Sequence, residues 1–185
     1  MSTTLAILLI AVIVIAALAG WAYLQKRRTA ALRGRFGPEY EHAVGEYGDR
    51  VRAERALERR AERIGKYQFR SLNRDEQQHF AEQWRQAQSR FVDDPALAIG
   101  EADRLVDEVM KARGYPMADF DRRAEDLSVD HPHVIRNYRA AHEIAVAREE
   151  GRASTEDLRR AMVHYRELFD ELLETQPANL PERGR

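Results

Sequence analysis

The sequence predicts an all-α fold: an N-terminal transmembrane helix, a charged stalk helix and then a soluble bundle of about five helices. The chain begins with a stretch of twenty residues without charge, Leu5 to Leu24. After residue 25, apolar residues recur three or four positions apart, which is the period of a helix face, and no stretch alternates over the length of a strand. The 185 residues suffice for one domain of ordinary size with an appendage.

Residues 1–25 are predicted to be a membrane anchor. At about 1.5 Å per residue, twenty apolar residues in a helix span the roughly 30 Å hydrocarbon core of a bilayer. Aromatic and basic side chains, which favour the headgroup level, follow at the C-terminal end of this stretch. We expect the membrane interface to be formed by Trp21, Tyr23, Lys26, Arg27 and Arg28.

The distribution of positive charge predicts the orientation. The juxtamembrane segment 26–37 carries five basic residues and no acid, whereas the residues before the apolar stretch carry no charged side chain. Basic flanks are retained in the cytoplasm, so we expect the N-terminus outside and the body cytoplasmic. The alternative is a periplasmic or secreted body, because Ala17-Leu18-Ala19 before Gly20 has the form of a signal-peptide cleavage site.

Composition excludes several classes of function. The chain has no cysteine, which removes disulfides, thiolate nucleophiles and zinc sites built on sulfur. Residues 38–70 are nearly neutral, with eight bases and seven acids, and the remainder is acidic, with 17 bases and 24 acids. The basic segment is explained by topology and carries only Phe36 as an aromatic residue, so we expect no nucleic-acid partner.

Residues 38–70 are predicted to form the charged stalk helix, which starts at Pro38 because proline suits the first turn. Its apolar stripe is interrupted at Glu54, which argues against a long, strict coiled coil. The interruption leaves three apolar residues as a candidate surface for a partner helix, namely Val51, Leu57 and Ile64. The alternative is that these three side chains pack inside the body.

Residues 71–174 are predicted to be the helical-bundle domain, and residues 175–185 a disordered tail. Capping residues, or proline in the first turn, predict five helix starts, at Asn73, Asp94, Asp119, Pro132 and Ser154. Within the second helix, Asp103 and Asp107 share a face that we interpret as solvated, because Arg104 and Lys111 are close enough to neutralise it.

The histidines are the candidate residues for metal binding or acid/base catalysis. The stretch LSVDHPHVIRNYRAAH, residues 127–142, holds three of the six, and with one more they form a candidate set for a metal or acid/base site: His131, His133, His142 and His164. The favoured interpretation is a helix start at Pro132 with Asp130 or His131 at the cap, and His142 and His164 as partly buried, hydrogen-bonded histidines. The zinc-protease signature is absent, because position 146, four residues after His142, is a valine.

No catalytic or cofactor motif is recognisable. The chain has no glycine-rich phosphate loop, no nucleophile elbow and no dinucleotide fingerprint. The sequence therefore nominates no catalytic residue and no cofactor, and it does not identify a small-molecule ligand.

Four segments carry a resemblance: RFVDDP (90–95), KARGYP (111–116), LSVDHPHVIRNYR (127–139) and STEDLRRAMVHYRELFDELL (154–173). They resemble a family of uncharacterised bacterial proteins that usually have one N-terminal membrane segment, over roughly residues 35–173. The resemblance implies a bacterial, membrane-linked helical protein, which would place the chain in the inner membrane. It transfers no catalytic residue, because the family has no established activity.

These observations favour a membrane-anchored, non-enzymatic protein-interaction or adaptor module that crosses the bilayer once. Two alternatives stay open. One is a metal-dependent or acid/base enzyme that uses the histidines. The other is a periplasmic helical protein that senses conditions in the envelope through histidine protonation.

Overall fold

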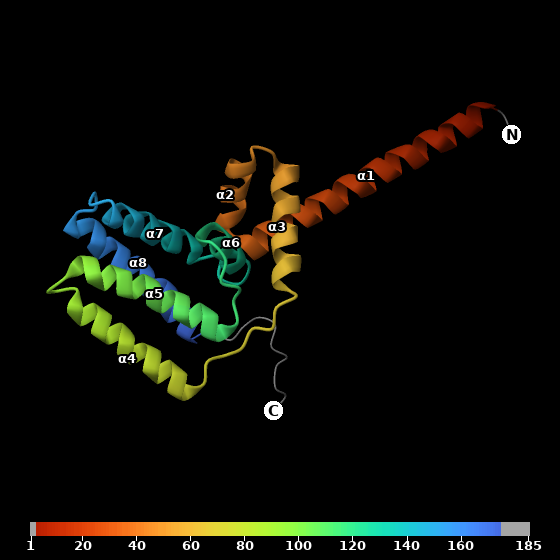
Figure 1. Ribbon diagram of the computed structural model, residues 1–185. Coiled ribbons are helices and arrows are strands. Elements are labelled where there is room, and N and C mark those ends of the chain that lie inside the picture. Colours follow the sequence, from red (N-terminus) through yellow and green to blue (C-terminus); the bar gives the residue numbers. More distant parts are fainter. Residues whose placement is uncertain (1–2, 175–185) are drawn as a thin grey trace.

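The computed structural model describes residues 3–174, which form eight helices and no strand. In chain order these are α1 (Thr3–Phe36), α2 (Pro38–Tyr47), α3 (Arg50–Ile64), α4 (Arg74–Arg90), α5 (Pro95–Arg113), α6 (Phe120–Asp130), α7 (Ile135–Glu149) and α8 (Thr155–Glu174). Figure 1 shows α1 projecting from a body made of the other seven helices. The all-α class and the bundle of five helices, α4 to α8, are confirmed. The predicted disordered tail, 175–185, lies outside the described residues.

Helix α1 is the one helix in the described range that is long and apolar enough to cross a membrane, and it equally fits a signal sequence. Every side chain from Ile7 to Leu24 is exposed. The helix continues through the basic segment to Phe36, and Leu32 and Phe36 are buried in the core. The predicted anchor and the basic segment are therefore one helix, whose C-terminal end belongs to the body.

Residues 38–70, predicted as one stalk helix, form two helices instead. Gly48 ends α2 in the left-handed conformation (φ 64°), which glycine adopts at little cost. Asp49 then caps α3, because its carboxylate accepts the backbone N–H of Arg52 at 2.8 Å. The two helices pack on each other, and residues 65–73 lead on to α4 without helical structure. The segment is thus part of the body.

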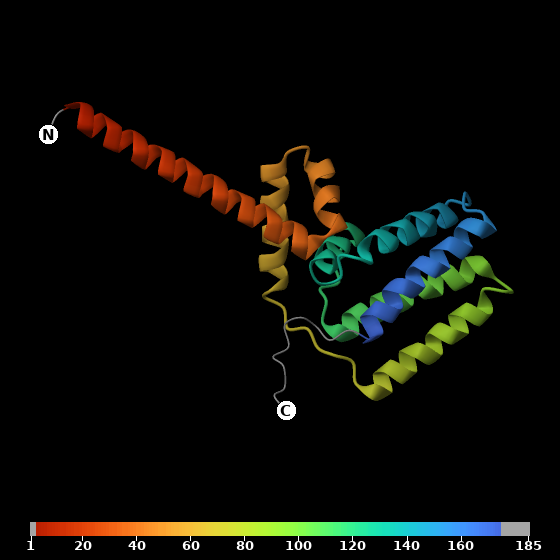
Figure 2. The same cartoon turned by 180° about the vertical axis from the view of Figure 1, so that it is seen from behind.

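Helices α5 and α8 are central to the bundle. Helix α7 packs on both of them, and α4 packs on α5, as Figure 2 shows from behind. Trp84 of α4 also stacks on Phe169 of α8, with ring centroids 4.6 Å apart. The predicted caps are present at Asn73, Asp94, Asp119 and Ser154, each with a side chain that accepts a backbone N–H three residues later.

The fourth helix start of the bundle differs from the prediction. Helix α7 begins at Ile135, three residues after Pro132, because residues 132–134 form a turn in which Val134 donates its N–H to the carbonyl of His131. The His131 side chain is turned into the body, where it makes its own hydrogen bonds. It does not cap the start of α7, and the backbone N–H of His131 instead caps the end of α6 by donating to the carbonyl of Leu127.

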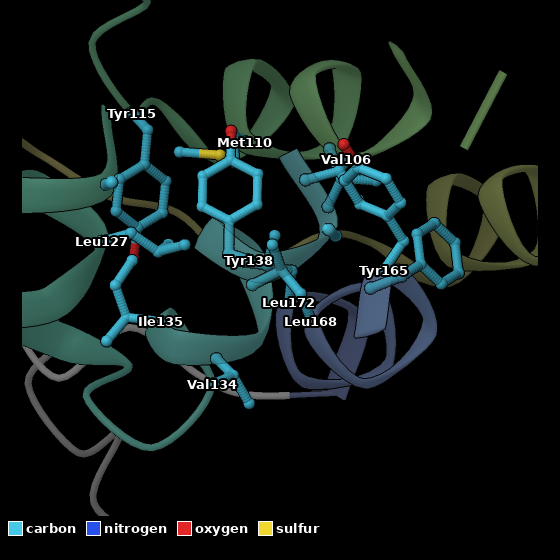
Figure 3. Packing of buried hydrophobic residues seen from close by; sticks show 14 of the residues in the cluster. Val106, Met110, Tyr115, Leu127, Val134, Ile135, Tyr138, Tyr165, Leu168 and Leu172 are labelled. Carbon is cyan, nitrogen blue, oxygen red and sulfur yellow. The ribbon is translucent and has the colours of Figure 1, made fainter. Parts of the chain in front are cut away.

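One hydrophobic core joins the bundle to the end of α1. Figure 3 shows its centre, where Val106 and Met110 of α5 lie near Tyr138 of α7 and Tyr165 of α8. The same cluster of buried residues extends through Tyr40 and Leu57 to Phe36. Because these side chains form one cluster, the end of α1 and the bundle are stabilised together.

Candidate functional site

A cleft of about 670 Å³ lies between α2, α3, α6 and α7. Most of its lining is charged. The acids are Glu46, Asp119, Asp121, Glu125 and Glu143, the bases are Arg60 and Arg139, and the remaining lining residues are His42, Phe120 and His142. This cleft is the candidate functional site, and we call it the acidic cleft.

Beneath the acidic cleft lies a buried ion-pair network centred on Glu39. This side chain is 1% exposed, and its Oε1 accepts from Arg60 Nη1 at 3.0 Å and from Arg139 Nη2 at 2.8 Å. Arg60, itself 2% exposed, also donates to Glu125 at 3.0 Å. Buried charges require such partners, because an unpaired one costs several kcal/mol. The network holds α2, α3, α6 and α7 together below the cleft.

The pairing leaves the cleft with surplus negative charge. Both arginines of its lining are engaged by Glu39 and Glu125. Asp119, Asp121 and Glu143 are exposed and make no ion pair within residues 3–174. The cleft therefore favours a cationic guest, such as a basic side chain of a partner.

An aromatic pair forms one wall of the cleft. The rings of Phe120 and His142 are nearly parallel, with centroids 3.5 Å apart. Behind them Arg123 donates to Asp107 at 2.6 Å, and the Tyr138 hydroxyl is buried close to this ion pair. Burial raises the pKa of Asp107, against the lowering effect of the Arg123 charge.

The carboxylates of α5 are not the solvated face that we expected. Asp103 accepts a hydrogen bond from Tyr165 at 2.7 Å, and Asp107 is paired with Arg123. Arg104 pairs with Glu108 instead. The two aspartates face the neighbouring helices α8 and α6, which carry their partners Tyr165 and Arg123. These partners are distant in sequence.

His131 and His133 meet at one carboxylate. His131 is buried, with Nδ1 2.9 Å from Glu171 Oε1 and Nε2 3.1 Å from the Tyr115 hydroxyl. We assign the proton of the neutral ring to Nδ1, because a carboxylate can only accept, and Nε2 then accepts from Tyr115. His133 is exposed and lies 3.2 Å from Glu171. The pair is a structural hydrogen-bond site, which the sequence did not predict for His131.

The other two candidate histidines lie elsewhere. His142 stacks on Phe120 at the cleft, and His164 is partly buried on α8. The expected hydrogen bonds are not found, because the buried Nδ1 of each ring has no partner among residues 3–174. In the part of the chain that the structure describes, no three His, Asp or Glu side chains are arranged to hold a metal ion. The metal-centre alternative therefore finds no ligand set there.

The candidate partner surface on α3 is corrected by burial. Leu57 and Ile64 are 0% and 1% exposed and belong to the core, so they pack internally. Val51 is 47% exposed and lies on the opposite side of the helix. Glu54, which interrupts the apolar stripe, is also buried, where it accepts hydrogen bonds from Thr29 and Tyr40. The interruption thus marks a buried polar contact.

The predicted membrane-interface residues occupy the middle of α1. Trp21, Tyr23, Lys26 and Arg27 are exposed, and the Arg27 guanidinium lies over the Tyr23 ring, 5.6 Å from its centroid. Arg28 differs, because it forms a bidentate pair with Glu58 of α3. This ion pair joins α1 to α3.

Comparison of the chain with known proteins adds no information about the acidic cleft. No family model, curated protein or solved structure matches the chain.

The buried His131 predicts a pH dependence of stability. Burial lowers its pKa from 6.5, although the hydrogen bond to Glu171 opposes the shift. Below about pH 6.5 the unfolded chain takes up a proton that the folded chain resists, so stability falls as pH falls, by at most about 1.4 kcal/mol per pH unit. We expect His131→Gln to flatten the dependence of the unfolding midpoint on pH between about 7 and 5.5.

The matched control is His79→Gln, because His79 is exposed on α4. Unfolding of the full chain in detergent micelles, followed by circular dichroism at several pH values, should show the parental slope for this variant. Equal slopes in the two variants would contradict the role of His131.

Proposed function

We propose that this chain is a single-span, membrane-anchored protein-interaction module of the bacterial inner membrane, without catalytic activity. The observation that carries the proposal is the continuity of α1, which runs from an exposed apolar stretch into the core of the body. An apolar helix with every side chain from residue 7 to residue 24 exposed is costly in water and stable in lipid. Anchoring also raises the concentration of the body for partners at the same membrane.

The proposed orientation places the N-terminus outside and the body in the cytoplasm. Its support is the basic segment directly after the apolar stretch, with Lys26 and Arg27 exposed. The alternatives are a periplasmic body and a cleaved signal sequence.

The proposed partner site is the acidic cleft, and the proposed partner is a protein with a basic segment. The supporting observations are the exposed carboxylates of Asp119, Asp121 and Glu143 and the neutralised arginines between them. The flat Phe120–His142 wall adds an aromatic surface on which a guanidinium can stack.

Anchoring and orientation can be tested with single cysteines, because the natural chain has none. Ser2→Cys and Ser89→Cys would be treated with a membrane-impermeant maleimide in intact spheroplasts and after lysis. We expect Ser2→Cys to react in both and Ser89→Cys only after lysis, with the protein resistant to carbonate extraction. The reverse pattern would overturn the orientation, and a mature protein that begins at Gly20 would show that the segment is a signal peptide.

The partner site can be tested by a photo-crosslinking amino acid at position 121, at the cleft, and at position 85, on the exposed face of α4. We expect a discrete protein adduct from position 121 alone. Asp119→Asn with Glu143→Gln should weaken the adduct, because these changes remove negative charge from the lining. An adduct that is equally strong from both positions, or unaffected by the charge changes, would refute the cleft as the docking site.

A further inference from the structure

We propose that the outer face of α3 is a binding surface for anionic lipid headgroups. This surface, which we call the α3 basic face, is formed by Arg52, Arg55 and Arg59. The inference rests on the proposed membrane anchoring by α1, and it assigns a second contact with the same bilayer.

The three arginines share one side of the helix. Positions 52, 55 and 59 are spaced by three and four residues, and all three side chains are exposed. The opposite side of α3 carries the buried Leu57 and Arg60. The α3 basic face is therefore turned away from the core.

This face carries surplus positive charge, because its three exposed arginines are accompanied by one exposed carboxylate, Glu62, three residues after Arg59. Within residues 3–174, Arg52, Arg55 and Arg59 form no ion pair with a carboxylate, whereas Arg60 and Arg63, on the inner side, are both paired with Glu125. Two further exposed cations, Lys26 and Arg27, lie on the neighbouring part of α1. An anionic surface would complement these charges.

Contacts with α1 set the depth of α3 relative to a bilayer. Glu54 accepts a hydrogen bond from Thr29 at 2.7 Å, and Glu58 pairs with Arg28. Arg28 and Thr29 lie four and five residues after Leu24, the last residue of the apolar stretch. At about 1.5 Å per residue this is roughly 6–8 Å. The polar layer on each side of the hydrocarbon core is about 5–8 Å thick, so α3 crosses α1 at headgroup level.

The arrangement of helices turns the α3 basic face toward the bilayer. Figures 1 and 2 both show α3 running across α1, with the bundle on the side away from the N-terminal end of α1. The buried side of α3 contacts the core, and the exposed side therefore faces the apolar end of α1. A protein partner at this face would have to enter between α3 and the membrane, and for that reason we assign the surface to lipid.

The expected effect is a local enrichment of anionic lipid. A cation close to an anionic bilayer contributes about 1 kcal/mol, which corresponds to about a fivefold preference. The preference should fall as salt is added, because the screening length is about 10 Å at 0.1 M ionic strength.

The test uses the full chain with Val51→Cys as its sole cysteine, labelled with a fluorescent donor. Val51 is exposed beside Arg52 on α3. The protein is placed in nanodiscs of phosphatidylcholine and phosphatidylglycerol that contain a trace of either lipid with an acceptor on its acyl chain. Energy transfer to the two tracers then reports the ratio of the two lipids near α3. We expect phosphatidylglycerol to be enriched about fivefold or more at low salt.

Three triple variants separate the effect of the α3 basic face from that of net charge. R52Q/R55Q/R59Q should bring the enrichment close to one, and lysine at the same three positions should retain it. R85Q/R159Q/R166Q removes the same charge from exposed positions of α4 and α8 and should leave the enrichment intact. All variants should unfold at the parental midpoint, because these side chains are exposed.

Three outcomes would overturn the inference. The parent protein could show no enrichment, the two glutamine variants could lose it equally, or the chain could fail to co-elute with nanodiscs. The first two outcomes leave the anchoring intact and remove only the lipid contact of α3, whereas the third also removes the proposed membrane anchoring.

Discussion

Glu39→Ala is expected to lower the free energy of unfolding by about 3–5 kcal/mol, the usual cost of removing one partner from a buried ion pair. The carboxylate of Glu39 bonds to Arg60 and Arg139, and Arg60 is almost fully buried. Without Glu39, Arg60 would keep only its contacts with Glu125 and Glu46. Chemical unfolding of the full chain in micelles, followed by circular dichroism, measures the loss.

The matched control for this change is Glu41→Ala on the same helix. The Glu41 side chain is 67% exposed, and its ion pair with Arg33 at 3.2 Å is at the surface. Exposed pairs contribute about 0–1 kcal/mol, so this variant should unfold close to the parent protein. If the two variants lost similar amounts of unfolding free energy, the buried ion-pair network would contribute no more to stability than an exposed ion pair does.

Phe36→Ala is expected to cost about 3–5 kcal/mol, because truncation of a buried phenylalanine leaves a cavity in the core. Phe36 is fully buried at the end of α1 and shares its cluster with Leu32, Tyr40 and Leu57. The change should also loosen the attachment of α1, so that limited proteolysis cuts near residue 37 at protease concentrations that spare the parent protein.

Trp21→Ala is the control on the same helix, because it also removes an aromatic ring from α1. Trp21 is exposed in the apolar part of the helix and contributes nothing to the core. Its unfolding midpoint and its proteolytic pattern should match those of the parent protein. If Phe36→Ala behaved in the same way, α1 would be only loosely joined to the body.

The sequence predicted those parts of the fold that depend on local patterns. The apolar stretch predicted a helix over Leu5 to Leu24 because its length and composition are sufficient for that inference. Asn73 predicted the start of α4 because a capping side chain acts on a backbone N–H only three positions away, here that of Glu76. The spacing of apolar residues likewise predicted that the regions of α5 and α8 are helical.

Contacts between distant residues could not be predicted in this way. Glu39 and Arg139 are 100 positions apart, and no periodicity indicates that they meet. The burial of Leu57 and Ile64 required knowledge of where α1 and α6 pack. One local signal was present, since Glu54 interrupted an apolar stripe. A charged residue in such a stripe indicates either exposure or a buried partner, and Tyr40 and Thr29 supply the partners.

Because Phe36 fixes the end of α1 in the core, a change in the tilt of α1 also moves the body. No flexible linker separates the apolar part of α1 from the core, so the body and the apolar part must tilt together. A transmembrane helix changes its tilt when the thickness of the bilayer changes. In a thinner membrane α1, inserted as proposed, would lean further, and the height of the acidic cleft above the lipid surface would change. Bilayer thickness would thereby set the height at which a partner meets the cleft.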